Sequence, residues 1–115
     1  MMADIRALTQ GYVQAFNSRS LENIANYMAQ DFELTDPEVF KLTPKPKVIN
    51  YIQELFDANE VLSFVANRIL VDGNVSVIHF SLTLGKNVLD GVDLITWDGE
   101  KMVKMHAYLT LRPEI

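Results

Sequence analysis

The spacing of apolar residues changes once along this chain, near Asn59, and no other feature constrains the fold as strongly. Before this point, apolar residues recur every three or four positions, which is typical of amphipathic helices. After it, β-branched and aromatic runs are separated by turn sequences such as Asp72-Gly73 and Asp98-Gly99, which is typical of successive antiparallel strands. Three short helices alone would bury too little apolar surface to be stable. We therefore expect residues 1–115 to form a single α+β domain, with the helices packed on the sheet.

Three helices and five strands follow from these patterns. We expect the helices at about residues 3–17, from residue 21 to residue 30 or 31, and from residues 43–46 to shortly before Asn59. We expect the strands at residues 32–36, 64–71, 75–84, 91–97 and 102–111. Within the second of the long strands, Val75 and Val77 interrupt the alternation of apolar and polar residues, which predicts a bulge or bend near Ser76-Val77.

The composition argues against several classes of partner. A net charge of −5 and a sequence pI near 4.8 oppose binding to nucleic acid, because the 10 basic residues are scattered along the chain. No stretch approaches the roughly 20 apolar residues that a membrane-spanning helix needs, and the polar start does not resemble a signal peptide. We therefore expect no nucleic-acid partner, no membrane association and, by elimination, a cytoplasmic location.

Metal and cofactor sites are not indicated either. Without cysteine the chain has no thiolate ligand, and two histidines without a third ligand at suitable spacing are a weak metal signal. The sequence has no phosphate-binding glycine loop, serine elbow or dinucleotide fingerprint. We expect no metal and no cofactor, and we expect His79 and His106 to lie on the outer surface of the sheet.

Asp93 is the most unusual carboxylate in the sequence. It lies within the apolar segment Val92-Asp93-Leu94-Ile95, with no basic neighbour to pair with it. If it faces inward, loss of hydration raises its pKa, and the protonated acid can donate a hydrogen bond at neutral pH. The alternative is a solvated strand edge or a structural hydrogen bond to a neighbouring turn.

Asp36 and Tyr12 are the other two candidates for a functional site. Asp36 ends the first predicted strand just before Pro37, where a rigid backbone fixes the direction of the carboxylate, and such a group can act as a general base. Its alternative role is that of a turn residue that binds its own backbone. Tyr12 lies on the apolar stripe of the first helix, so its hydroxyl needs a partner, which in most proteins is a backbone carbonyl. Among the other tyrosines, only Tyr108 is expected to reach a pocket.

Four segments of the sequence together resemble the nuclear transport factor 2-like superfamily, in its SnoaL-like and ketosteroid isomerase-like branch. They are residues 12–17 (YVQAFN), 34–37 (LTDP), 71–74 (VDGN) and 91–99 (GVDLITWDG). The resemblance covers nearly the whole chain. It implies a cone-shaped, cystatin-like fold in which three N-terminal helices pack in the hollow of a strongly curved, mainly antiparallel sheet, with an opening that admits a small hydrophobic molecule.

The resemblance also implies roles for the three candidate residues. Asp36 corresponds to the base that moves a proton, while Tyr12 and a protonated Asp93 correspond to the pair that donates hydrogen bonds to an enolate oxygen. The auxiliary tyrosine of the steroid enzymes is replaced by Gln53 on the third helix. The wall of the implied pocket consists of Phe16, Ile78, Phe80, Leu82, Met105, Ala107 and Leu109.

Two functions remain open at this point. The first is a cofactor-independent acid–base enzyme, an isomerase or a polyketide cyclase, that acts on a small hydrophobic carbonyl compound. The second is a non-catalytic module that binds a small molecule or dimerises, since a fold alone does not determine function. With either function the resemblance implies a homodimer that pairs through the outer face of the sheet, which carries His79, Ser81, Thr83 and His106.

Overall fold

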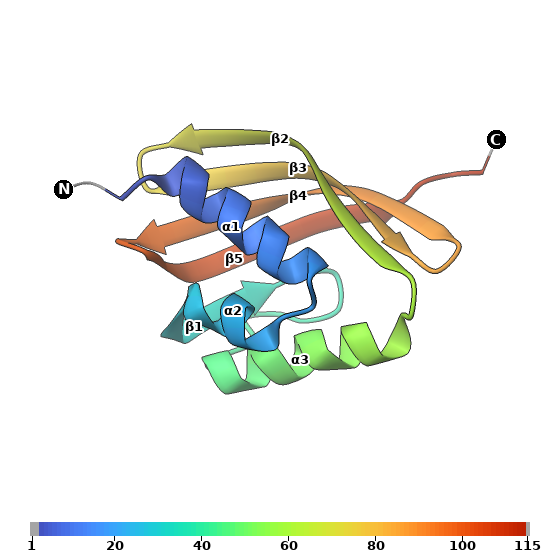
Figure 1. Cartoon of the computed structure of the whole chain (residues 1–115), viewed down its shortest axis with the longest axis horizontal. Helices are drawn as coiled ribbons and strands as arrows, with labels where there is room; N and C mark the ends of the chain where they lie inside the picture. Colours follow the sequence, from blue (N-terminus) through green and yellow to red (C-terminus); the bar gives the residue numbers. More distant parts are fainter. Residues whose placement is uncertain (1–2, 115) are drawn as a thin grey trace.

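The computed structural model describes residues 3–114 and has three helices on one face of a five-stranded mixed sheet (Figure 1). The helices are α1 (Ile5–Asn17), α2 (Leu21–Asn26) and α3 (Lys45–Ala58). The strands are β1 (Met28–Thr35), β2 (Leu62–Asp72), β3 (Val75–Leu84), β4 (Asn87–Asp98) and β5 (Lys101–Leu111). Their order in the sheet is β1-β5-β4-β3-β2, and only the β1–β5 pair is parallel. The predicted α+β class and the helix-then-sheet arrangement are confirmed.

The boundary between α2 and β1 differs from the sequence prediction. Met28 continues the apolar spacing of the helix, yet α2 ends at Asn26 and β1 already begins at Met28. The cause is pairing with β5: the amide of Met102 donates to the carbonyl of Tyr27 at 2.6 Å, and Met28 is the register partner of Met102. Strand pairing over a long sequence separation therefore overrides the local helical pattern.

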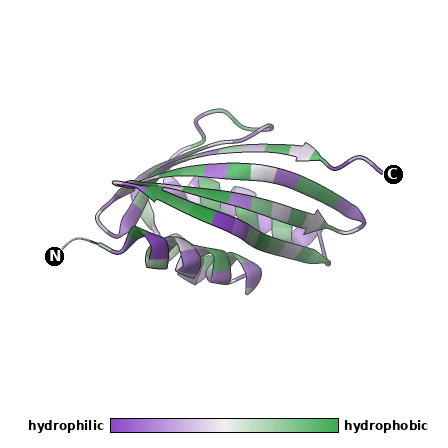
Figure 2. Cartoon of the chain, turned by 90° about the horizontal axis from the view of Figure 1, so that it is seen from above, coloured by the Kyte–Doolittle hydropathy of each residue, from purple (hydrophilic) through white to green (hydrophobic). Residues whose placement is uncertain are grey.

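The sheet is curved, and its irregularities lie away from β3. Register shifts occur in β2, where Asn67 is an extra residue between Ala66 and Arg68, and in β5, where Val103 is an extra residue opposite Thr96 and Trp97 of β4. Such extra residues bend a strand. In Figure 2 the N-terminal helix lies along one face of the sheet, while hydrophobic and hydrophilic residues alternate along the strands.

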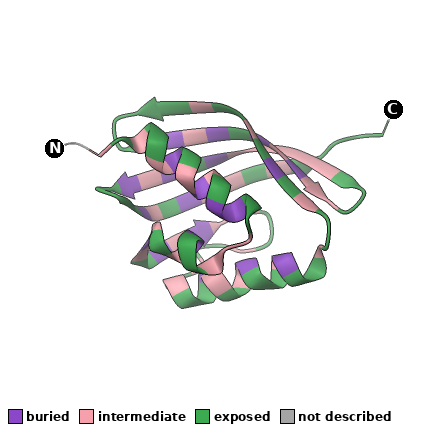
Figure 3. Ribbon diagram, viewed as in Figure 1, coloured by how far each residue is buried: buried purple, intermediate pink, exposed green. Residues whose placement is uncertain are grey.

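The bulge predicted near Ser76 is wrong, because β3 pairs without interruption with β4. Ser76 keeps the phase of the buried face and is itself fully buried. Its Oγ accepts a hydrogen bond from Trp97 Nε1 at 2.9 Å and lies 2.8 Å from the hydroxyl of Thr9 on α1. Ser76 is thus a polar residue at a core position, where its hydrogen bonds are satisfied. Its polar side chain interrupts the apolar pattern of the strand without a bulge. Figure 3 shows the alternation of buried and exposed residues along the strands.

The corner after α1 joins three elements. Arg19 has a positive φ of 56°, and its guanidinium donates to the carbonyls of Phe56, Asn59 and Glu60 at the end of α3. Asn17, the last residue of α1, donates to the carbonyl of Phe64 at 2.6 Å and accepts from its amide at 2.8 Å. These bonds fix α3 and the start of β2 against α1, and so fix the walls of the space between them.

Candidate active site

One cavity of about 470 Å³ lies between the helices and the concave face of the sheet. Its lining includes Tyr12 from α1, Asp36 from the end of β1 and Asp93 from β4, so the three predicted polar residues meet in one cavity although they are far apart in the sequence. The lining also includes six of the predicted wall residues, namely Phe16, Phe80, Leu82, Met105, Ala107 and Leu109. Most of the remaining lining is apolar, as in pockets for small hydrophobic molecules.

Ile78 does not belong to the lining, in contrast to the prediction. It faces the same side of β3 as Phe80 and is fully buried in the core. Ile78 is two residues from Ser76, which contacts Thr9 of α1, so the helix covers this end of the concave face. The cavity therefore begins further along β3, at Phe80.

Asp93 faces the cavity and is only 5% exposed. Its register partners on the adjacent strands are Ile78 and Ala107, which cannot pair with a charge. No hydrogen bond joins its carboxyl group to another group within residues 3–114. Burial, together with the nearby charge of Asp36, raises the pKa of Asp93 from 3.8 to about 7. The carboxyl group therefore exists largely as a neutral acid below pH 7 and can donate a hydrogen bond.

Tyr12 is also buried, at 4% exposure, and its ring packs against Phe16 and edge-on against Tyr27. Burial and, to a smaller extent, the charge of Asp93 raise the pKa of the Tyr12 phenol well above its ordinary value. Its hydroxyl thus keeps its proton at any physiological pH. Tyr12 and, below pH 7, Asp93 are therefore two protonated groups that face the same cavity.

Asp36 closes the turn after β1 and also lines the cavity. Its Oδ1 accepts from the amides of Glu38 at 2.8 Å and Val39 at 3.0 Å, which closes the turn after β1. Its Oδ2 accepts a hydrogen bond of 2.8 Å from the hydroxyl of Tyr51 on α3, and both residues line the cavity. Asp36 and Tyr51 are half-buried, so they lie nearer the opening than Tyr12 and Asp93.

Tyr51 is the site residue that the sequence analysis missed. Burial, and then the hydrogen bond to Asp36, raise the pKa of its phenol. Gln53, which took the tyrosine position in the family resemblance, is exposed on α3. Tyr108, the tyrosine that was expected to reach the pocket, is 54% exposed on the opposite face, where its ring stacks on His106 at 4.1 Å.

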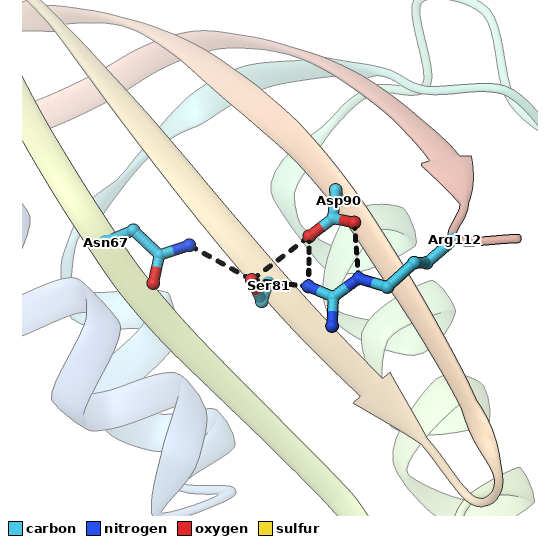
Figure 4. A network of polar contacts seen from close by, with 4 residues as sticks. All are labelled: Asn67, Ser81, Asp90 and Arg112. Carbon is cyan, nitrogen blue, oxygen red and sulfur yellow. Dashed lines mark hydrogen bonds and ion pairs between the residues drawn. The ribbon is translucent and has the colours of Figure 1, made fainter. Parts of the chain in front are cut away.

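The outer face of the sheet carries the predicted polar residues and a network of hydrogen bonds. His79 is exposed there. Figure 4 shows Ser81 between Asn67 and Asp90, with the guanidinium of Arg112 bound to both carboxylate oxygens of Asp90 at 2.7 and 2.8 Å. The bond from Arg112 lowers the pKa of Asp90. Asp90 and Asp93 thus lie on the same strand but on opposite faces, with opposite pKa shifts.

Within residues 3–114, no three or more His, Cys, Asp or Glu side chains are grouped so that they could hold a metal ion. None of the helices in this part of the chain has the length and apolar character needed to cross a bilayer.

The combination of a curved mixed sheet, three helices and an enclosed apolar cavity defines a class of small cone-shaped pocket proteins. The sequence model of the SnoaL-like domain matches residues 9–105, and the chain belongs to this family. No curated protein sequence matches it.

Solved structures agree with this assignment. A nuclear transport factor 2-like protein of unknown function from Cytophaga hutchinsonii superposes with a TM-score of 0.83 at 12% identity, over 96% of this chain and 93% of that one. A candidate ketosteroid isomerase from Kribbella flavida gives 0.81 at 23% identity, over 96% and 81% of the two chains. A candidate SnoaL-like polyketide cyclase from Shewanella denitrificans gives 0.79 at 16%, over 92% and 90%. At these identities the likeness establishes the fold and not the activity.

Proposed function

We propose that this SnoaL-like protein catalyses cofactor-independent acid–base chemistry on a small hydrophobic carbonyl compound. The observation that carries the proposal is Asp93, a buried carboxyl group without a hydrogen-bond partner within residues 3–114. Its pKa is raised to about 7, and it faces the cavity together with a protonated tyrosine. Buried acids of this kind are costly to the fold, and pKa shifts of this size cluster at functional sites. The likeness to a candidate ketosteroid isomerase and a candidate polyketide cyclase supports the same type of reaction.

In the proposed reaction, a carbonyl oxygen accepts hydrogen bonds from Tyr12 and the protonated Asp93. Asp36 removes a proton from the neighbouring carbon, and the electron pair moves towards the oxygen, whose growing negative charge the two donors stabilise. Return of the proton to a different carbon gives the isomer, whereas attack of the enolate on a second carbonyl gives an aldol product. Tyr51 orients the Asp36 carboxylate through its hydrogen bond to Oδ2.

The test is the conversion of β,γ-unsaturated ketones into their conjugated isomers, followed by ultraviolet absorbance. We expect turnover by the wild-type protein and a loss of about a hundredfold or more in Asp36→Asn, because general base catalysis contributes 10²–10⁴-fold. Asp90→Asn, on the outer face of β4, is the control and should keep full activity. If wild type and Asp36→Asn are equally inert across several such ketones, the isomerase is ruled out.

A second candidate function is a binding module without chemistry, and the contacts of Asp36 favour it. Three hydrogen bonds already occupy its two carboxylate oxygens, so fewer of their lone pairs are free to accept a proton from a ligand. Such a module would bind the same apolar molecules and leave them unchanged. Recovery of intact ketone after prolonged incubation, together with saturable binding, would identify it.

We also propose that the protein forms a homodimer through the outer face of the sheet. This face exposes Val65, Leu70, Leu94 and Tyr108. They come from β2, β4 and β5 and lie in neighbouring rows of cross-strand partners. In one of these rows, Val77 of β3 is the partner of both Leu70 and Leu94. An exposed apolar group of this extent on a small domain supports an association surface.

A further inference from the structure

The charged side chains that line the cavity all have the same sign. Among residues 3–114, its lining contains four carboxyl groups and two phenols, and no lysine, arginine or histidine. The carboxyl groups are those of Asp36, Glu38, Glu54 and Asp93. Glu38 and Glu54 are exposed at the opening, whereas Asp93 lies deep inside. A ligand that enters this cavity therefore meets negative potential along its whole path.

The deep carboxyl group lacks the counter-ion that a buried charge needs. Asp93 is only 5% exposed and faces the cavity, and its cross-strand partners on both sides are apolar. An ionised carboxylate in such a place is costly unless an opposite charge accompanies it. None of the lining residues in the described part of the chain supplies that charge, so a cationic ligand would be its partner.

The wall offers a second form of attraction for a cation. The rings of Tyr12, Phe16, Phe64 and Phe80 all border the cavity. The face of an aromatic ring attracts an ammonium group, and the attraction is stronger where water is excluded. The same rings provide the apolar contact area for the hydrocarbon body of a ligand.

We propose that the cavity binds apolar amines, with the ammonium group beside the carboxylates of Asp93 and Asp36, and that it rejects anionic molecules of the same shape. The neutral carbonyl compounds of the proposed reaction lie between these extremes. The inference rests on the cavity and its charges and does not require that the protein is an enzyme. It also distinguishes this pocket from one that accepts fatty acids, acyl phosphates or other anionic substrates.

Three probes with one ring system test the charge preference: 2-naphthylmethylamine, 2-naphthylmethanol and 2-naphthoate. With titration calorimetry of the wild-type protein at pH 8, we expect the amine to bind about tenfold or more tightly than the alcohol, as close ion pairs allow. The carboxylate should bind at least about tenfold more weakly than the alcohol. Equal affinities for amine and alcohol, or tighter binding of the carboxylate, would overturn the inference.

The variant Asp93→Asn separates the charge from the shape of the pocket. We expect it to lose about tenfold in affinity for the amine and to keep its affinity for the alcohol within about threefold. Asp90→Asn, which removes a carboxylate from the outer face of the same strand, should leave all three affinities unchanged. A loss of alcohol and amine affinity to the same extent in Asp93→Asn would mean that the pocket itself had changed and that charge does not select the ligand.

The number of protons released on amine binding also tests the role of Asp93, because a purely structural role would not change this number with pH. The other ionisable groups of the cavity are Tyr12 from α1, Asp36 and Glu38 after β1, and Tyr51 and Glu54 from α3. Because the pKa of Asp93 is about 7, and a tenfold preference for the ionised acid lowers it by about one unit in the complex, binding of an ammonium ion at pH 6 should expel roughly 0.4 of a proton or more. Binding at pH 8.5 should expel almost none. Calorimetry in buffers with different ionisation enthalpies counts these protons. The same number of released protons at both pH values would contradict the inference. The proposed reaction is tested separately, by ketone turnover.

Discussion

Asp93 makes the stability of the folded protein depend on pH in a direction that is unusual for a carboxyl group. Because its pKa rises from 3.8 to about 7 on folding, the folded state binds more protons than the unfolded chain between about pH 4 and pH 7. Its contribution therefore falls as pH rises through this window and levels off above it. From pH 5.5 to pH 8 the free energy of unfolding should fall by about 2 kcal/mol on account of this residue.

Asp93→Asn should remove this slope and should be more stable than the wild-type protein at pH 8. Urea denaturation of both proteins at pH 5.5, 6.5, 7.5 and 8 measures the difference. Asp90→Asn is the matched control: since the pKa of Asp90 is lowered by Arg112, its effect lies at acid pH and the slope above pH 5.5 should stay. Parallel pH profiles for wild type and Asp93→Asn would contradict the burial of this carboxyl group.

The positions of single residues could be predicted where one local pattern decides them. Alternation along β5 places Ala107 towards the cavity and Tyr108 away from it, so the expectation that Tyr108 reaches a pocket contradicted the pattern itself. The helical spacing of Val48, Tyr51 and Ile52 would have placed Tyr51 on the cavity side of α3. The hydrogen bond from Tyr51 to Asp36 could not be predicted, because it depends on how α3 lies against β1.

At the scale of elements, the contact between Arg19 and the end of α3 determines how firmly one wall of the cavity is held. The Arg19 guanidinium donates to three carbonyls there and lies 5.6 Å from the centre of the Phe56 ring. Asparagine tolerates the positive φ of this position, so Arg19→Asn removes the side-chain contacts without added backbone strain. We expect a loss of about 1–3 kcal/mol in the free energy of unfolding, because the carbonyls lose a charged donor.

Amide hydrogen exchange should locate this effect at the end of α3 and at the start of β2. Glu100→Ala is the control, since Glu100 is exposed in the turn between β4 and β5 and its loss should change stability by less than about 0.5 kcal/mol. Uniformly faster exchange across the sheet, with α3 no more affected than β4, would show that the corner after α1 is not a separate anchor.

The elements after Asn59 followed closely from the sequence, whereas those between α1 and α3 did not. Residues 75–84 form β3 with the predicted bounds, because turns with Gly73 and Gly85 at positive φ limit it on both sides. The segment around Met28 has a helical apolar pattern and no turn glycine, and its strand forms only because β5 offers a parallel partner. Local sequence carries no signal for a partner that lies more than 70 residues away.

At the scale of the whole molecule, the two faces of the sheet lead to different expectations. The concave face is covered by helices and encloses the cavity, while the outer face leaves Leu94 42% exposed and Tyr108 54% exposed. The hydrogen-bonded network of Asn67, Ser81, Asp90 and Arg112 borders them, because Ser81 and Asp90 form the next row of cross-strand partners after that of Tyr108 (Figure 4). An apolar centre with a polar border is the usual composition of a protein interface.

We therefore expect the wild-type chain of 13.1 kDa to sediment at twice this mass. Leu94→Glu should shift the protein to the monomer at micromolar concentration, because two copies would bury unpaired carboxylates against each other. Leu111→Glu is the control: Leu111 is also exposed, at 57%, but alternation along β5 places it on the side of Leu109, so the dimer should persist. Analytical ultracentrifugation of the three proteins checks this. If the wild-type protein is still a monomer at 100 times the concentration used for Leu94→Glu, the dimer is ruled out. If Leu94→Glu is itself a dimer, the interface lies on another face.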